Sequence, residues 1–130
     1  MRILVVEDDA ADILFMRKAF EKVCPGITVD VAENGDLAVA AIERDPPTHV
    51  FLDLKLPKRS GLEILEWIRG RTVTSHLPVV ILTSSNEKRD IERARELGVD
   101  DYRVKPVSFP ELAELVRQIL FSWGLVPIQK

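Results

Sequence analysis

The side chains best suited to chemistry follow directly on short apolar segments of the sequence. They are carboxylates, a hydroxyl and an amine, namely Glu7 and Asp8, Asp53, Thr83, and Lys105. For any one of them, capping of the next helix is the simpler interpretation, because acids and hydroxyls are favoured caps. As a set at successive segment ends, they predict a single polar site.

The predicted site gathers three carboxylates, and these need a cation. Two carboxylates about 5 Å apart repel by roughly 3 kcal/mol at an effective dielectric constant near 20. Lys105 supplies one positive charge against Glu7, Asp8 and Asp53. An oxygen-rich pocket with room for water suits Mg²⁺ better than zinc, and neither histidine is placed to bind a metal. We therefore expect a Mg²⁺ site.

The elements that position these residues alternate along the chain. Five short apolar, β-branched runs predict strands, at residues 3–6, 28–31, 49–52, 79–82 and 102–104. Between them lie segments with helical spacing, such as Leu112, Leu115, Val116, Ile119 and Leu120. Because several strands are apolar throughout, we expect a parallel sheet covered by helices on both faces. Such a doubly wound α/β fold places its site beyond the carboxyl ends of the strands.

Length and charge exclude several classes of protein. The 130 residues form one domain rather than two, and the formal charge of −3, with both signs interspersed, argues against binding nucleic acid. No apolar run is long enough to cross a bilayer, so we expect no membrane contact. The single Cys24 excludes an internal disulfide and fits a cytoplasmic location.

The order of these motifs resembles the receiver domain of bacterial two-component response regulators. The resemblance runs from Ile3 to about Phe121 and rests on Glu7-Asp8, Asp53-Leu54-Lys55-Leu56-Pro57, Gly61, Thr83, Tyr102 and Lys105-Pro106. Each motif alone is weak, but their joint order on alternating strands is specific. The resemblance implies a flavodoxin-like fold, with five parallel strands in the order 2-1-3-4-5 and helices on both faces.

The resemblance also implies a role for each pocket residue. Asp53 accepts a phosphoryl group from a phosphohistidine of a sensor histidine kinase. Asp8, Asp53 and the main-chain carbonyl of Lys55 bind Mg²⁺, and Glu7 acts through water. Lys105 and the metal neutralise charge on the phosphoryl oxygens. We expect phosphorylation at Asp53 alone, because no other carboxylate should reach both the metal and Lys105.

Two further implications concern signalling and the lifetime of the phosphoryl group. Thr83 is expected to bind the phosphoryl group and Tyr102 to follow as a two-state switch, while Lys105–Pro106 is expected to be a cis peptide. Neither Lys55 nor Ser85 offers the group that best orients an attacking water, which predicts a long-lived acyl phosphate. Lys55 either pairs with phosphoryl oxygens or points into solvent.

The carboxyl-terminal residues form an apolar arm. We divide the chain into a receiver domain, residues 1–121, and an arm, residues 122–130, with no separate output domain, so signalling relies on conformational switching or phosphorelay. The arm resembles that of regulators paired with bacterial phytochrome kinases. Its expected dimer contacts are Phe121, Trp123, Leu125, Val126 and Ile128. We expect Gly124 to end the helix in a left-handed cap and the arm to leave as an extended strand that pairs two copies. Packing back on its own helix is the alternative.

Two competing functions remain. A magnesium-dependent phosphatase with an aspartyl nucleophile usually carries a second acid two residues later, where this chain has Lys55. A receiver-like binding module that is not phosphorylated normally lacks an acid, the lysine or the nucleophile, and this chain has all of them. We therefore expect a phosphoacceptor, one that assists its own phosphorylation and dephosphorylation, rather than an enzyme.

Overall fold

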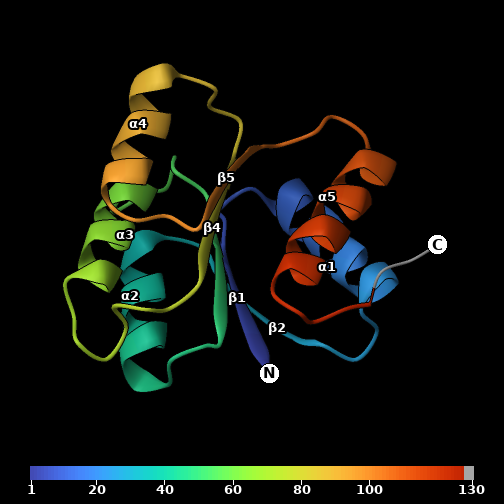
Figure 1. Ribbon diagram of the computed structural model, residues 1–130, viewed down its shortest axis with the longest axis horizontal. Coiled ribbons are helices and arrows are strands. Elements are labelled where there is room, and N and C mark those ends of the chain that lie inside the picture. The colour runs from blue at the N-terminus through green and yellow to red at the C-terminus, as the bar shows by residue number, and fades with distance from the viewer. Residues whose placement is uncertain (128–130) are drawn as a thin grey trace.

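Strands and helices alternate throughout this computed structural model, which describes residues 1–127 (Figure 1). The strands are β1 (Arg2–Val6), β2 (Thr28–Ala32), β3 (His49–Leu52), β4 (Val79–Thr83) and β5 (Asp101–Val104). The helices are α1 (Ala10–Val23), α2 (Gly35–Arg44), α3 (Gly61–Arg69), α4 (Lys88–Glu96) and α5 (Phe109–Ser122). All five predicted strands are confirmed, each to within a residue at either end.

The strands form one parallel sheet in the order β2-β1-β3-β4-β5, as expected. Helices α1 and α5 cover one face, and α2, α3 and α4 cover the other (Figure 1). Because all strands run the same way, their carboxyl ends share one edge. None of the helices within residues 1–127 is long and apolar enough to span a bilayer.

Two apolar clusters, one on each face of the sheet, hold the layers together. Successive side chains of a strand point to opposite faces, so Ile3 and Val5 pack with α1 and α5, while Leu4 and Val6 pack with α2 and α3. This explains why β1 is apolar at consecutive positions. The apolar run therefore suits the place of β1 inside the sheet, between β2 and β3, where Glu7 follows its end at the edge shared by the other strand ends.

The end of α5 differs in part from expectation. Gly124 has a φ of 75°, and Leu125 N–H donates to the carbonyl of Leu120 at 2.9 Å, which confirms the left-handed cap. The expected extended strand is wrong for residues 123–127, which form a turn and bends. Instead Trp123 stacks on His49, with ring centroids 4.5 Å apart.

The chain itself therefore covers much of the arm. Trp123 also meets Phe51 edge to face, and Leu125 and Val126 pack against the cluster beneath α1 and α5. The alternative was packing on the arm's own helix, and the ring contacts of Trp123 are instead with β3. Phe121 remains 45% exposed, and Ile128 lies outside the described residues.

Candidate functional site

Strand pairing brings the two buried acids side by side. The sheet ladder extends one residue past β1 and β3, because Glu7 N–H donates to the carbonyl of Ala32 at 3.0 Å and Asp53 N–H to that of Val6 at 3.1 Å. Carboxylate oxygens of Glu7, Asp8 and Asp53 lie within 4.8 Å of one another. We call these three residues the acid cluster. Glu7 and Asp53 are buried, whereas Asp8 is exposed.

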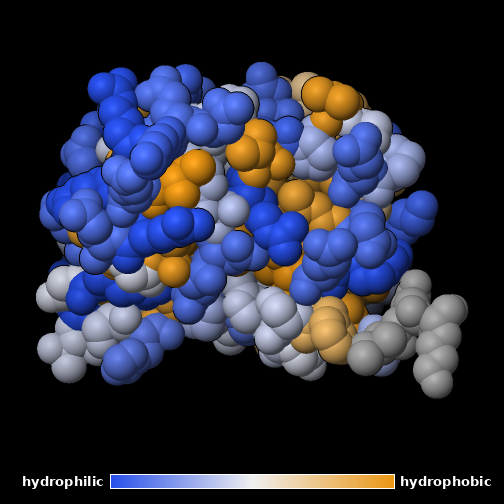
Figure 2. All heavy atoms as spheres, turned by 45° about the horizontal axis from the view of Figure 1, so that its top comes forward, coloured by the Kyte–Doolittle hydropathy of each residue, from blue (hydrophilic) through white to orange (hydrophobic). Residues whose placement is uncertain are grey.

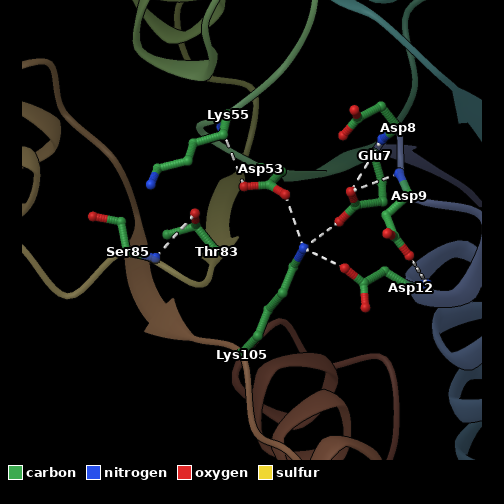
Figure 3. A network of polar contacts seen from close by, with 9 residues as sticks. All are labelled: Glu7, Asp8, Asp9, Asp12, Asp53, Lys55, Thr83, Ser85 and Lys105. Atoms are coloured by element: carbon green, nitrogen blue, oxygen red, sulfur yellow. Dashed lines mark hydrogen bonds and ion pairs between the residues drawn. The ribbon is translucent and has the colours of Figure 1, made fainter.

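Lys105, which follows β5, joins this cluster to α1. Its Nζ lies 2.5 Å from Glu7 Oε1, 2.8 Å from Asp53 Oδ2 and 2.8 Å from Asp12 Oδ2 (Figure 3). Burial alone would lower the pKa of Lys105, but hydrogen bonds to Asp12, Asp53 and Glu7 raise it above its ordinary value. The ammonium is therefore charged at any physiological pH and has a carboxylate for each of its three N–H groups.

Asp12 is the functional residue that the sequence analysis missed. It lies in the first turn of α1, whose N-cap is Asp9, and an acid there is an ordinary feature of a helix start. The one available signal was its position a few residues beyond Glu7. A contact with Lys105 depends on the rotation of α1 about its axis, which the motif does not reveal.

Burial and charge distinguish the two buried acids. Burial raises the pKa of Glu7 to about 7, with the hydrogen bond from Lys105 acting against it and the charge of Asp53 adding to it. Burial is the largest influence on Asp53 and raises its pKa, but hydrogen bonding from Lys105, Thr83 and the backbone of Lys55, together with the charge of Lys105, leaves the pKa below its ordinary value. Asp53 is therefore an ionised carboxylate at neutral pH, while Glu7 is partly protonated.

The position of Glu7 contradicts one expectation from the sequence. Glu7, like Asp53, reaches both the acid cluster and Lys105, so the expectation that no other carboxylate does so is wrong. Both oxygens of Glu7 are also engaged, since its Oε2 accepts from the N–H groups of Asp8 and Asp9. Protonation state, rather than reach, distinguishes Asp53 from Glu7 as the candidate nucleophile.

Thr83 and Tyr102 are linked through the loop after β4. Thr83 is buried, and its Oγ1 accepts from Ser85 N–H at 3.4 Å. The Tyr102 hydroxyl donates to the carbonyl of Ser85 at 2.9 Å. The two predicted switch residues therefore contact the same residue of one loop. The peptide bond before Pro106 is trans, as are all those within residues 1–127, so the expected cis bond is wrong.

The two positions expected to govern hydrolysis carry no group aimed at Asp53. The Ser85 hydroxyl donates to Asp90 Oδ2 at 2.6 Å and is directed away from Asp53 (Figure 3). Lys55 N–H donates to Asp53 Oδ1 at 3.3 Å, but its side chain is exposed and pairs with no acid in residues 1–127. The side chain of Lys55 therefore lies in solvent here, and its pairing with phosphoryl oxygens stays a prediction.

Gly61 allows α3 to begin directly against the backbone of Asp53. A Cβ atom at this position would lie 2.2 Å from the carbonyl oxygen of Asp53. Only glycine, which has no Cβ atom, avoids this clash. The Gly61 N–H donates to the carbonyl of Leu54 at 2.9 Å, and Ser60 caps the helix with a capping box to Glu63. The Ser60-Gly61 pair thus fixes the backbone on which Asp53 is carried.

The donor set fits a hard divalent cation. The acid cluster offers only oxygen, and with Asp12 it sets four carboxylates against the single ammonium of Lys105. Asp8 is exposed, so one side of the cluster opens to water. Mg²⁺ prefers carboxylate oxygens and keeps several waters, and zinc would prefer nitrogen or sulfur ligands. The residues present therefore fit Mg²⁺.

Comparisons with known proteins agree with this geometry. The family described as the response regulator receiver domain matches residues 3–117. The phosphate regulon transcriptional regulatory protein PhoB of Rhizobium meliloti (strain 1021) is 37% identical over 119 residues, which are 92% of this chain and 52% of that protein. The chain thus spans about half the length of that relative.

Solved structures give the same result. The phosphorylated cyanobacterial phytochrome response regulator RcpA has a TM-score of 0.88 at 29% identity, covering 95% of this chain and 93% of that one. The Mn²⁺-bound form of response regulator Rcp1 has a TM-score of 0.87 at 28% identity, covering 99% of both chains. Fold, site and sequence agree, and the chain belongs to the response regulator receiver domain family.

Proposed function

We propose that this chain is a phosphoacceptor signalling domain in which Asp53 accepts a phosphoryl group from a sensor histidine kinase. The observation that carries the proposal is the hydrogen bond from Lys105 to Asp53 Oδ2 beside the acid cluster. This contact lowers the pKa of a buried carboxyl against the effect of burial. An ionised, oriented carboxylate next to a cation is what attack on phosphorus requires.

The proposed step exchanges one bond at phosphorus for another. A carboxylate oxygen of Asp53 attacks, the P–O bond forms, and the P–N bond to the donor imidazole breaks. Asp8, Asp53 and the main-chain carbonyl of Lys55 would hold Mg²⁺, with Glu7 acting through water, and the ion would neutralise charge on the phosphoryl oxygens. Lys105 donates a hydrogen bond to one of these oxygens and remains charged throughout.

The switch follows from the contacts around Ser85. When the Thr83 hydroxyl moves to donate a hydrogen bond to a phosphoryl oxygen, it draws along the Ser85 N–H, which donates to the same hydroxyl. The carbonyl of Ser85 holds the Tyr102 hydroxyl, so a shift of the loop also moves Tyr102. A change at the sheet edge is thereby transmitted to β5 and α4.

A protein donor is favoured by the surface beside the site. A groove of about 90 Å³ is lined by both Asp12 and Lys105 and by apolar side chains that include Phe15 and Val107. Val107 is fully exposed and Phe15 nearly half exposed. Figure 2 shows apolar side chains set among hydrophilic ones on this side of the molecule. RcpA is a phytochrome response regulator, which favours a phytochrome histidine kinase as the donor.

Other parts of the expected function remain proposals. The lone Cys24 supports a cytoplasmic location. A phosphatase is not favoured, because the position two residues after Asp53 carries the exposed Lys55 rather than a second acid. The domain would assist its own phosphorylation, and its slow dephosphorylation would rest on the same pocket.

Mass spectrometry tests the phosphorylation site. Acetyl phosphate with Mg²⁺ should add one phosphoryl group to the wild-type chain, and removal of Mg²⁺ by EDTA should abolish the addition. Asp53→Asn should remain unmodified, while Asp45→Asn, an exposed acid elsewhere, should react like the wild type. Equal labelling of Asp53→Asn would disprove the assignment.

Homodimerisation is still proposed, but with Phe121 as the main contact instead of the whole set expected from the sequence. Trp123 is held against His49 and Phe51, so among the expected dimer contacts that the structure describes, the exposed Phe121 has most surface left to bury. Light scattering at micromolar concentration should give about twice 14.7 kDa. Phe121→Asp should give a monomer that is still phosphorylated, and a wild-type monomer would refute the proposal.

A further inference from the structure

Asp12 is the partner of Lys105 that lies outside the acid cluster. Its Oδ2 is 2.8 Å from Lys105 Nζ, the same distance as that of Asp53 Oδ2. Its backbone is fixed, because Asp12 N–H donates to the N-cap Asp9 at 2.9 Å. Its side chain is 38% exposed, compared with 4% and 8% for those of Glu7 and Asp53.

The position of Asp12 matters because Lys105 is a flexible side chain with competing demands. A lysine ammonium ends a four-carbon stem and orients freely unless its partners fix it. Two of its partners, Glu7 and Asp53, belong to the cluster that would bind a divalent ion, and Asp53 would also carry the phosphoryl group. Asp12 is not a member of the acid cluster, so its ion pair with Lys105 does not depend on what binds there.

We propose that Asp12 is a positioning residue that keeps the Lys105 ammonium beside Asp53 while the other two carboxylates change partners. This inference rests on the proposed phosphorylation of Asp53. Helix α1 would anchor Lys105, because Asp12 lies in the first turn of that helix and Lys105 directly follows β5. The contact ties the loop before α5 to α1 at the edge where a donor must approach.

The charge of Asp12 by itself predicts the opposite effect on the reaction. A small donor such as acetyl phosphate is an anion, so removing a nearby carboxylate should speed its approach through electrostatics alone. Loss of the contact that orients Lys105 should instead slow the transfer, because the ammonium is then less often placed to meet the phosphoryl oxygens. The sign of the change therefore separates the two roles.

Variants at Asp12 test the proposal with acetyl phosphate and saturating Mg²⁺. Asp12→Ala should lower the first-order rate constant of phosphorylation roughly three- to tenfold, as expected for one partly exposed ionic hydrogen bond. Asp12→Asn keeps an acceptor oxygen and should lose less. Because Asp12 is outside the acid cluster, the Kd of Mg²⁺ measured by calorimetry should change by no more than about twofold. Asp36→Ala is the matched control, since Asp36 also lies in the first turn of a helix but pairs with Arg59.

A second measurement needs no reaction and no metal. With ¹⁵N-labelled lysine and EDTA, the Nζ–H signal of Lys105 should be visible in the wild type and in Asp36→Ala, because three carboxylates hold its hydrogens. It should be lost by faster exchange with water in Asp12→Ala and weakened in Asp12→Asn. A rate constant in Asp12→Ala equal to or above that of the wild type, or an unchanged Lys105 signal, overturns the inference. A wild type that acetyl phosphate does not label overturns the proposed function instead.

Discussion

Replacement of Asp8 by asparagine should stabilise the metal-free protein and remove most of its response to Mg²⁺. Asp8 is the exposed member of the acid cluster, and it forms no ion pair with a basic side chain within residues 1–127. Its carboxylate has an oxygen within 4.8 Å of oxygens on both Glu7 and Asp53. Without a metal it contributes repulsion and little else.

The magnitude follows from these separations. Two charges 4.8 Å apart, the upper bound within the cluster, repel by about 1 kcal/mol at the dielectric constant of water, and by more where burial lowers it. Asp8 is repelled by Asp53 and by the ionised fraction of Glu7 and attracted by the one nearby ammonium, so at most about one such pair remains. Asp8→Asn should therefore raise the free energy of unfolding by up to about 1 kcal/mol, and the melting temperature by up to roughly 3 °C.

Thermal and urea unfolding in EDTA and in millimolar Mg²⁺ provide the assay. The wild type should gain stability with Mg²⁺, because the ion binds only where the three acids converge, and Asp8→Asn should gain much less. Asp53→Asn should not be stabilised in EDTA, because it also loses the ion pair with Lys105. A metal-free Asp8→Asn that is less stable than the wild type would refute this reasoning.

Three further predictions concern the same pocket. In EDTA the free energy of unfolding should fall by roughly 3 kcal/mol as pH rises from 4.5 to 7. The cause is that Glu7, with its pKa of about 7, holds a proton in the folded state that it releases on unfolding. Urea titrations of Glu7→Gln should lack this slope. Gly61→Ala should destabilise the fold by about 2 kcal/mol or more in urea, since its methyl group meets the carbonyl of Asp53, whereas Gly70→Ala, whose Cβ would lie 3.3 Å from its nearest neighbour, should be mild. Lys55→Asn with Ser85→Glu should shorten the acyl phosphate lifetime roughly tenfold or more by phosphate release, and an unchanged lifetime would show that these positions do not govern hydrolysis.

The arrangement of the pocket was predictable because it depends on strand ends. Five apolar runs identify the strands, and parallel strands place their carboxyl ends at one edge whatever the helices do. Glu7, Asp53, Thr83 and Lys105 are therefore brought together by backbone pairing alone. Local signals were also sufficient for the left-handed cap at Gly124, because glycine is the residue that adopts this conformation freely.

The contacts that were missed depend on distances between side chains far apart in sequence. The contact of Asp12 with Lys105 requires the rotation of α1 against β5, and that of Trp123 with His49 joins the end of α5 to the start of β3. No periodicity or motif encodes these placements, since they result from how whole layers pack.

The three contacts of Lys105 also bear on the stoichiometry of the pocket. An ammonium has three N–H groups, and here each has a carboxylate oxygen within 2.8 Å. A phosphoryl oxygen thus cannot simply be added to Lys105, and it must take the place of an oxygen already there. Phosphorylation is in this sense a ligand exchange at nitrogen as well as at phosphorus. The carboxylate oxygen that leaves Lys105 becomes free to bind a new partner, so at Lys105 a contact is exchanged rather than added.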